Sequence, residues 1–229
     1  SGREVFTSIY GYQDAVIDRS LPQSAEELPA DYALQNPADY ISAVKALLKD
    51  ITNNAEVSPE DIISIGIDFT ACTVLPVDKN YKPLCMNPRF RKNPHSWVKL
   101  WKHHGAQAEA DEINETARRR GEIFLDYYGG SSSSEWFFAK AMEVYHKAPE
   151  IYEATELFVE AGDWVIWALT GEMTTSTCMA GYKAFWNHET GYPKNDFFAG
   201  MEPGLSGITE KVISDVRPVG AKAGGLTKE

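Results

Sequence analysis

The spacing of apolar and polar residues first divides the chain into strand-like segments. Apolar and polar residues alternate over residues 4–10, which predicts a strand. Residues 62–69 and 72–77 are rich in β-branched and apolar side chains, so we expect two buried strands there. Residues 78–82 then form a turn into a short third strand at 83–85. These segments predict a sheet.

Helical spacing of apolar residues follows in four other segments. They are residues 39–51, a region from Pro94 to about Arg120, residues 135–146, and a helix, strand and helix over residues 150–170. We expect a serine within 131–134 to cap the third helix and Gly171 to end the last. Residues 13–36 are expected to be a loop. The order of elements predicts an α/β domain with a mixed sheet flanked by helices.

Composition narrows the classes of partner. The 229 residues are 43% hydrophobic, enough for one large domain, and the net charge of -11 disfavours binding to the phosphate backbone of a nucleic acid. No apolar run approaches the roughly 20 residues of a membrane-spanning helix. We therefore expect a cytoplasmic protein without nucleic-acid or membrane partners.

The three cysteines, Cys72, Cys85 and Cys178, are odd in number and lack CxxC spacing. This argues against a disulfide framework and a structural zinc site. We expect reduced thiols in the core.

Several segments of the chain together resemble a known family. The first is the run from Ile65 to Pro76, and the second is the run from Asn93 to His104. Further matches lie at residues 126–136, 162–171, 181–186 and 224–226. These segments resemble the N-terminal, sugar-binding half of the FGGY carbohydrate kinases. The resemblance implies a ribonuclease H-like domain of the actin-type ATPase class, paired in the complete enzyme with a second copy across the active-site cleft.

The resemblance also implies an activity. The chain most resembles the branch of the family that transfers phosphate from ATP to L-ribulose, giving L-ribulose 5-phosphate in L-arabinose catabolism. In that reaction Mg²⁺ would neutralise the phosphates of ATP. Residues 1–229 would be an N-terminal domain incomplete at both ends, lacking the C-terminal nucleotide-binding domain and inactive alone. Two alternatives stay open: a kinase for another ketose or polyol, such as xylulose, D-ribulose or glycerol, and a noncatalytic sugar-binding module. A homodimer also stays open.

Two residues are the main candidates for sugar binding. The turn at residues 68–73 carries a small residue, Ala71, where a backbone amide could approach a sugar. The alternative is that Ala71 only packs in the core. Lys183 lies between Tyr182 and Phe185, so its ammonium could bond a sugar oxygen while its stem packs. The alternative is a solvated surface charge. The resemblance favours substrate binding for both.

Two aromatic residues are further candidates implied by the resemblance. Trp101 matches a family tryptophan that walls the polyol pocket, although Lys102-His103-His104 departs from the pattern that follows it in the family. Tyr128 matches a tyrosine near the sugar. We expect His103 and His104 to lie on a helix face, pointing about 100° apart and unable to share a metal ion. The chemistry-bearing residues therefore predict no metal site.

Catalytic and nucleotide-binding groups are expected mostly outside the chain. Asp163 precedes a tryptophan at a helix start and is interpreted as structural. The resemblance places the general-base aspartate beyond Glu229, so no catalytic residue is expected here. Ser1, Gly2 and Arg3 resemble the end of the family's phosphate-binding turn.

Overall fold

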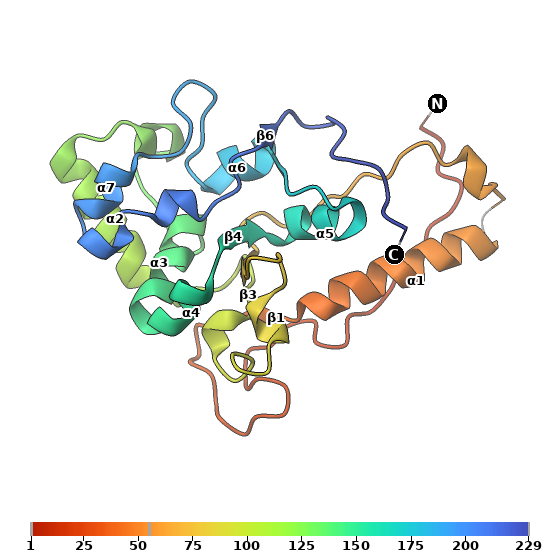
Figure 1. The fold of residues 1–229 in the computed structure, drawn as a ribbon, viewed down its shortest axis with the longest axis horizontal. Coiled ribbons are helices and arrows are strands. Elements are labelled where there is room, and N and C mark those ends of the chain that lie inside the picture. The colour runs from red at the N-terminus through yellow and green to blue at the C-terminus, as the bar shows by residue number, and fades with distance from the viewer. Residues whose placement is uncertain (1, 55, 229) are drawn as a thin grey trace.

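The computed structural model describes residues 2–54 and 56–228 as helices packed on both faces of a small sheet (Figure 1). The helices are α1 Pro37–Asn54, α2 Gln107–Arg120, α3 Phe137–Lys147, α4 Pro149–Ala154, α5 Ala161–Thr170, α6 Thr177–Lys183 and α7 Asn195–Ala199. The strands are β1 Leu34–Gln35, β2 Val74–Val77, β3 Val98–Lys99, β4 Leu157–Glu160, β5 Thr175–Ser176 and β6 Val216–Arg217. Among the described residues, no helix is long and apolar enough to cross a membrane.

The central sheet has the strand order β1-β3-β2-β4 and is antiparallel at every pairing. Leu75 of β2 lies opposite Val159 of β4. The parallel pairing expected of a mixed sheet occurs between β5 and β6, which form a separate sheet. Helices on a sheet confirm the predicted α/β class.

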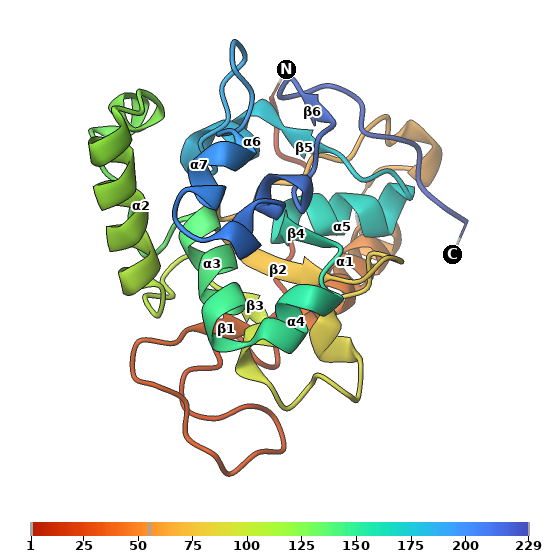
Figure 2. The ribbon, with the colours of Figure 1, turned by 60° about the vertical axis from the view of Figure 1, so that its left-hand side comes forward.

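Alternation along β2 and β4 creates a separate core on each face of the sheet. Val74 and Phe158 point into a core formed with α2, α3 and α7, whereas Leu75 and Val159 point into a core formed with α1 and α5. Figure 2 shows these two groups of helices on either side of β2 and β4. Each large apolar side chain buried here contributes about 1.5–3 kcal/mol.

Three of the helical predictions are confirmed. The segments predicted at 39–51 and 135–146 correspond to α1 and α3, and the helix, strand and helix over 150–170 are α4, β4 and α5. Gly171 ends α5 with a φ of 76°, a conformation that a residue with a Cβ adopts only with strain.

Two predicted strands are wrong. Residues 4–10 and 62–69 belong to no strand in the described part of the chain. The first segment lies along α1, where the Ser8 hydroxyl donates to Asp50. In the second, Ile67 and Phe69 pack on the α1 core, but the Ile63 side chain is 96% exposed. The side-chain pattern suits a strand, yet a strand also requires a neighbouring backbone edge.

The helix predicted to begin at Pro94 begins later in the structure. Residues Pro94–Ser96 form a single 3-10 turn, β3 follows, and α2 starts only at Gln107. Pairing with β1 and β2 on both sides overrides the helical spacing. His103 and His104 therefore precede the helix instead of lying on its face.

Two smaller predictions are also wrong, and a third is confirmed only in part. The segment 83–85 overlaps a 3-10 helix, Leu84–Met86, instead of a strand. No serine side chain caps α3, whose N-cap residue is Trp136. Cys72 and Cys85 are buried free thiols as expected, but Cys178 is exposed on α6.

A buried ionic network ties β3 to α3. One carboxylate oxygen of Glu143 lies 2.8 Å from both Lys99 Nζ and His103 Nε2. The other lies 3.2 Å from Lys147 Nζ. Burial alone would raise the pKa of Glu143, but Lys99 and His103 outweigh burial and lower it. The buried Glu143 carboxylate therefore attaches α3 to β3 and to the loop that follows it.

We expect Glu143→Gln to destabilise the chain by about 3 kcal/mol or more, because it leaves the buried Lys99 ammonium without its counter-charge. Urea unfolding at pH 7 measures the loss. Glu153→Gln, on the exposed side of α4, is the matched control and should change the unfolding free energy by less than about 0.5 kcal/mol. Equal effects of the two substitutions would show that the network is not stabilising.

Asp163 lies in the first turn of α5 and is almost fully buried. One of its carboxylate oxygens, Oδ2, has no hydrogen-bond partner. Burial raises the pKa of Asp163 to about 7, and a hydrogen bond from Thr175 opposes this only in part. A proton is therefore held by the folded state over a pH range in which the unfolded chain has lost it.

Since the folded-state pKa of Asp163 is raised, its contribution to stability is present below the unfolded pKa near 4 and is lost as pH rises through 7. Asp163→Asn cannot ionise. We expect the free energy of unfolding of the variant, minus that of the parent chain, to increase by about 2–3 kcal/mol between pH 5 and pH 8. Denaturant unfolding at both values measures this, with exposed Asp18→Asn as control. A pH-independent difference would contradict the burial argument.

Candidate functional site

The turn at residues 68–73 is held in a fixed shape by a buried glutamate. The two carboxylate oxygens of Glu160 accept hydrogen bonds from the backbone N–H groups of Cys72 and Thr73, each at 3.0 Å. Cys72 has a φ of 64°, a left-handed conformation that these bonds stabilise. Ala71, directly before it, is half-buried and reaches the surface. Core packing alone therefore does not account for Ala71.

Lys140, a buried residue of α3, joins this turn to the segment that carries Trp101. Its ammonium donates to the carbonyl oxygens of Cys72 at 2.5 Å and Leu100 at 2.8 Å. The side chain is fully buried, and burial lowers its pKa. The nearby Glu160 carboxylate opposes this by favouring the charged amine. The same ammonium group therefore holds the backbone next to Ala71 and the backbone next to Trp101.

Trp101 follows β3 and presents 44% of its surface to solvent. A ring exposed to that extent can serve as the apolar wall of an open sugar pocket. The same loop continues to His104, whose Nε2 lies 3.6 Å from Glu135 Oε1 and whose Nδ1 lies 3.4 Å from the Ser134 hydroxyl. The loop is therefore attached to the segment before α3.

Lys183 ends α6 and is neither a free surface charge nor a core residue. Its side chain is 19% exposed, and its ammonium lies 3.6 Å from Glu135 Oε2. It also lies 5.3 Å from the centre of the Tyr182 ring. Glu135 thus bridges His104 and Lys183 with its two oxygens, and one carboxylate connects the Trp101 loop to α6.

Tyr128 is hydrogen-bonded to α6. Its hydroxyl donates to the carbonyl oxygen of Gly181 at 2.6 Å. Its ring packs edge-on against Trp136 and Phe185, with centroids 5.2 and 5.3 Å away. Because its hydroxyl is used by the backbone two residues before Lys183, the geometry gives Tyr128 a positioning role.

Electrostatics link the turn to α6 as well. Burial raises the pKa of the Cys72 thiol, while the positive charges of Lys140 and Lys183 act in the opposite direction. Both ammonium groups therefore act on the thiol of the residue next to Ala71. The segments that carry Ala71, Trp101, Tyr128 and Lys183 all attach to the N-terminal end of α3, through Lys140, Glu135 and Trp136.

Sequence reasoning missed the three residues that connect these candidates, Lys140, Glu135 and Glu160. A signal for two of them was available. Lys140 is the charged residue in the run Phe137–Met142, and Glu160 ends the apolar strand β4. A charge within an apolar run is buried only when it is paired or hydrogen-bonded, so both positions indicate a polar network.

The predicted nucleotide-binding residues lie elsewhere. Ser1 is outside the described residues. Gly2 has a φ of 67° with open space around it, and Arg3 is exposed. Figure 1 shows this end of the chain at the upper right of the view, whereas α3 lies at the left. Their role in binding phosphate stays a prediction.

Comparison with known proteins identifies relatives over the whole chain. The N-terminal domain of the FGGY family of carbohydrate kinases matches residues 13–229. The chain is 49% identical to the ribulokinase of Bacillus licheniformis and 48% identical to that of Geobacillus thermodenitrificans. Both matches cover 100% of the chain but only 42% and 41% of the two relatives.

A solved structure agrees on the fold. The structure of a xyloylose kinase from Brucella ovis superposes with a TM-score of 0.70 at 16% identity, covering 89% of this chain and 38% of that one. This confirms the actin-like ATPase fold. From the family match and the ribulokinase relatives together, we conclude that the chain belongs to the FGGY family of carbohydrate kinases and is homologous to the N-terminal part of ribulokinases.

Proposed function

We propose that the chain is the sugar-binding half of a cytoplasmic kinase that transfers phosphate from ATP to L-ribulose, giving L-ribulose 5-phosphate for L-arabinose catabolism. The observation that carries this proposal is the convergence of Ala71, Trp101 and Lys183 on one end of α3, held there by Lys140 and Glu135. The ribulokinase relatives supply the choice of sugar.

We assign the contacts with the sugar to polar groups that are not already fully hydrogen-bonded within the protein. The amides of Cys72 and Thr73 bond Glu160, so we assign the amide of Ala71 to a sugar oxygen. The Lys183 ammonium, with three donors, can bond a sugar oxygen and keep its contact with Glu135. Trp101 would cover the apolar face of the sugar. Tyr128 would hold the end of α6 in place.

We assign the general base, ATP and Mg²⁺ to residues of the complete protein outside this chain. In the described part of the sugar site, the carboxylate beside Lys183 is Glu135, which already bridges Lys183 and His104. It does not fit the role of a free magnesium ligand. The chain contributes the positioning of the sugar, and the attacking hydroxyl would lose its proton to an aspartate from the rest of the protein.

The segment 62–69 supports the view that these residues are part of a larger domain. It pairs with no strand within the described residues, and Ile62, Ile63 and Ile65 are exposed. An unpaired apolar strand edge is a liability in an isolated protein. We propose that a strand from the complete protein pairs with it.

A test of the proposal compares the complete protein with the 229-residue chain. We expect the complete protein to release ADP with L-ribulose, and more efficiently than with xylulose, D-ribulose or glycerol. The chain alone should release none above background, since loss of a general base by itself costs about 10²–10⁴-fold. Sugar binding without ADP release by the complete protein would instead support a noncatalytic sugar-binding module.

Substitution of Lys183 tests its contact with the sugar. We expect Lys183→Met in the complete protein to lower kcat/KM for L-ribulose by about 10–100-fold, because a hydrogen bond to a charged group is lost. The KM for ATP should change little. Exposed Lys79→Met is the matched control. An unchanged kcat/KM for L-ribulose would show that Lys183 serves only as the ion-pair partner of Glu135.

A further inference from the structure

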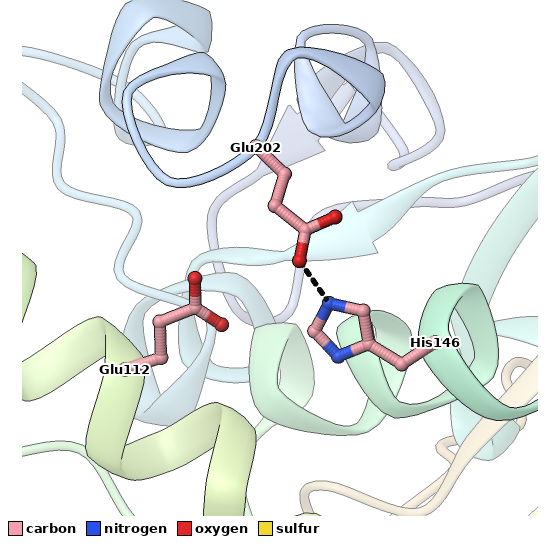
Figure 3. Close-up of side chains that lie close together, drawn as sticks. All are labelled: Glu112, His146 and Glu202. Carbon is pink, nitrogen blue, oxygen red and sulfur yellow. Dashed lines mark hydrogen bonds and ion pairs between the residues drawn. The ribbon is translucent and has the colours of Figure 1, made fainter.

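A second polar cluster lies at the other end of α3. Figure 3 shows His146, in the last turn of α3, with Glu112 of α2 and Glu202 of the segment before Pro203. One ligand atom of each residue lies within 4.8 Å of those of the other two, and His146 Nε2 is 3.0 Å from Glu202 Oε1. The cluster is about 15 Å along the helix from Trp136, so it is separate from the sugar site.

A fourth residue, Glu109, reaches the same imidazole from within the protein. Its side chain is only 3% exposed, and its Oε1 lies 2.9 Å from His146 Nδ1. Its other oxygen, Oε2, is buried without a hydrogen-bond partner. A buried carboxylate is costly unless it is hydrogen-bonded, so the bond to His146 fixes the orientation of Glu109 and of the imidazole together.

The bond to Glu109 also determines which nitrogen of His146 is available. Both ring nitrogens lie within hydrogen-bonding distance of carboxylate oxygens, so both donate when His146 is protonated. When the ring is neutral and Nδ1–H donates to Glu109, Nε2 has a free lone pair on the side of Glu202. A carboxylate that holds the far nitrogen of a ligating histidine is the usual support of protein metal sites. Glu109 would be this support, and the other three residues would be the ligands.

The charge of the cluster favours a cation. Three carboxylates, Glu109, Glu112 and Glu202, surround one imidazole, so the cluster is negative even when His146 is protonated. The guanidinium of Arg119 acts on Glu112 only through its charge, and it donates to the Thr116 hydroxyl. A divalent ion would offset the excess negative charge.

From this geometry we propose that His146 Nε2, Glu112 and Glu202 bind a divalent first-row transition metal ion, such as Zn²⁺, with Glu109 as the orienting carboxylate. One nitrogen and two oxygen ligands suit such ions better than Mg²⁺, which prefers oxygen alone. Ligand atoms about 2.1 Å from an ion in a tetrahedral site lie about 3.4 Å from one another, so small side-chain rotations would bring the three ligand atoms to this spacing. The ion would cross-link α2, α3 and the chain before Pro203.

The alternative is a metal-free cluster in which a protonated His146 bridges the carboxylates. Burial lowers the pKa of His146, but its bonds with Glu109 and Glu202 outweigh burial and raise it. The two arrangements differ in one observable property. Only the metal site binds Zn²⁺ tightly and with one equivalent per chain.

The test is calorimetric titration of the full 229-residue chain with Zn²⁺ at pH 7.5, repeated with Mg²⁺. Cys178→Ser is used as background, because the exposed thiol would itself bind Zn²⁺. We expect one equivalent of Zn²⁺ to bind, Mg²⁺ not to bind, and Zn²⁺ to raise the melting temperature. Glu109→Gln should weaken Zn²⁺ binding by about 10–100-fold without removing a ligand. His146→Gln should weaken it at least as much.

His188→Gln and Glu153→Gln are the matched controls, since both residues are exposed and outside the cluster. They should leave Zn²⁺ affinity unchanged. Glu112→Gln serves as the second ligand variant if His146→Gln fails to fold by circular dichroism. Zn²⁺ binding that is equal in the parent and Glu112→Gln, or that is lost equally in His188→Gln, would overturn the proposal and leave the metal-free cluster.

Discussion

The geometry of the candidate sugar site depends on one buried ammonium group. Lys140 reaches from α3 to the carbonyl oxygens of Cys72 and Leu100, and so fixes two segments that are far apart in sequence. Burying a charge is costly unless it is hydrogen-bonded and balanced. The two carbonyls supply the hydrogen bonds, and Glu160 accepts hydrogen bonds from the backbone N–H groups of Cys72 and Thr73 in the same turn. The turn before β2 therefore has little freedom to move.

Ion pairs and hydrogen bonds also hold the segments that carry the other candidate sugar-binding residues. Glu135 joins His104 to Lys183, and Tyr128 fixes the backbone of α6 through Gly181. The Glu143 network secures α3 itself to β3. These contacts fix the segments that carry the residues we assign to the sugar. Positioning from rigid elements is what a site needs to bind a small polar ligand with specificity.

The sequence was sufficient for the class of fold and for the elements whose pattern is local. Helices α1, α3 and α5 carry an apolar stripe or end at a glycine, and both signals are visible within a few residues. The prediction failed where pairing decides the structure. Residues 62–69 have a strand-like composition but no neighbouring edge in the described chain, whereas β3 has two neighbours and forms a strand despite its helical spacing.

The site was predictable to a similar extent. Ala71 and Lys183 were reached through family resemblance, and the structure places them within one polar framework, although their contact with a sugar stays a prediction. The framework itself was not predictable, because the run around Lys140 shows that a charge is buried but not which carbonyls it meets. His146 and Glu202 are 56 residues apart and meet only through the packing of the helices.

The central claim is that a sugar meets the backbone at the turn that Lys140 and Glu160 hold. Ala71→Leu in the complete protein tests it most directly, with L-ribulose binding and melting temperature both measured. Ala71 reaches the surface, so the larger side chain should obstruct the sugar without overpacking the core. The account predicts a large rise in KM for L-ribulose with a small shift in melting temperature. A strongly lowered melting temperature with a normal KM would place Ala71 in the core and contradict the account.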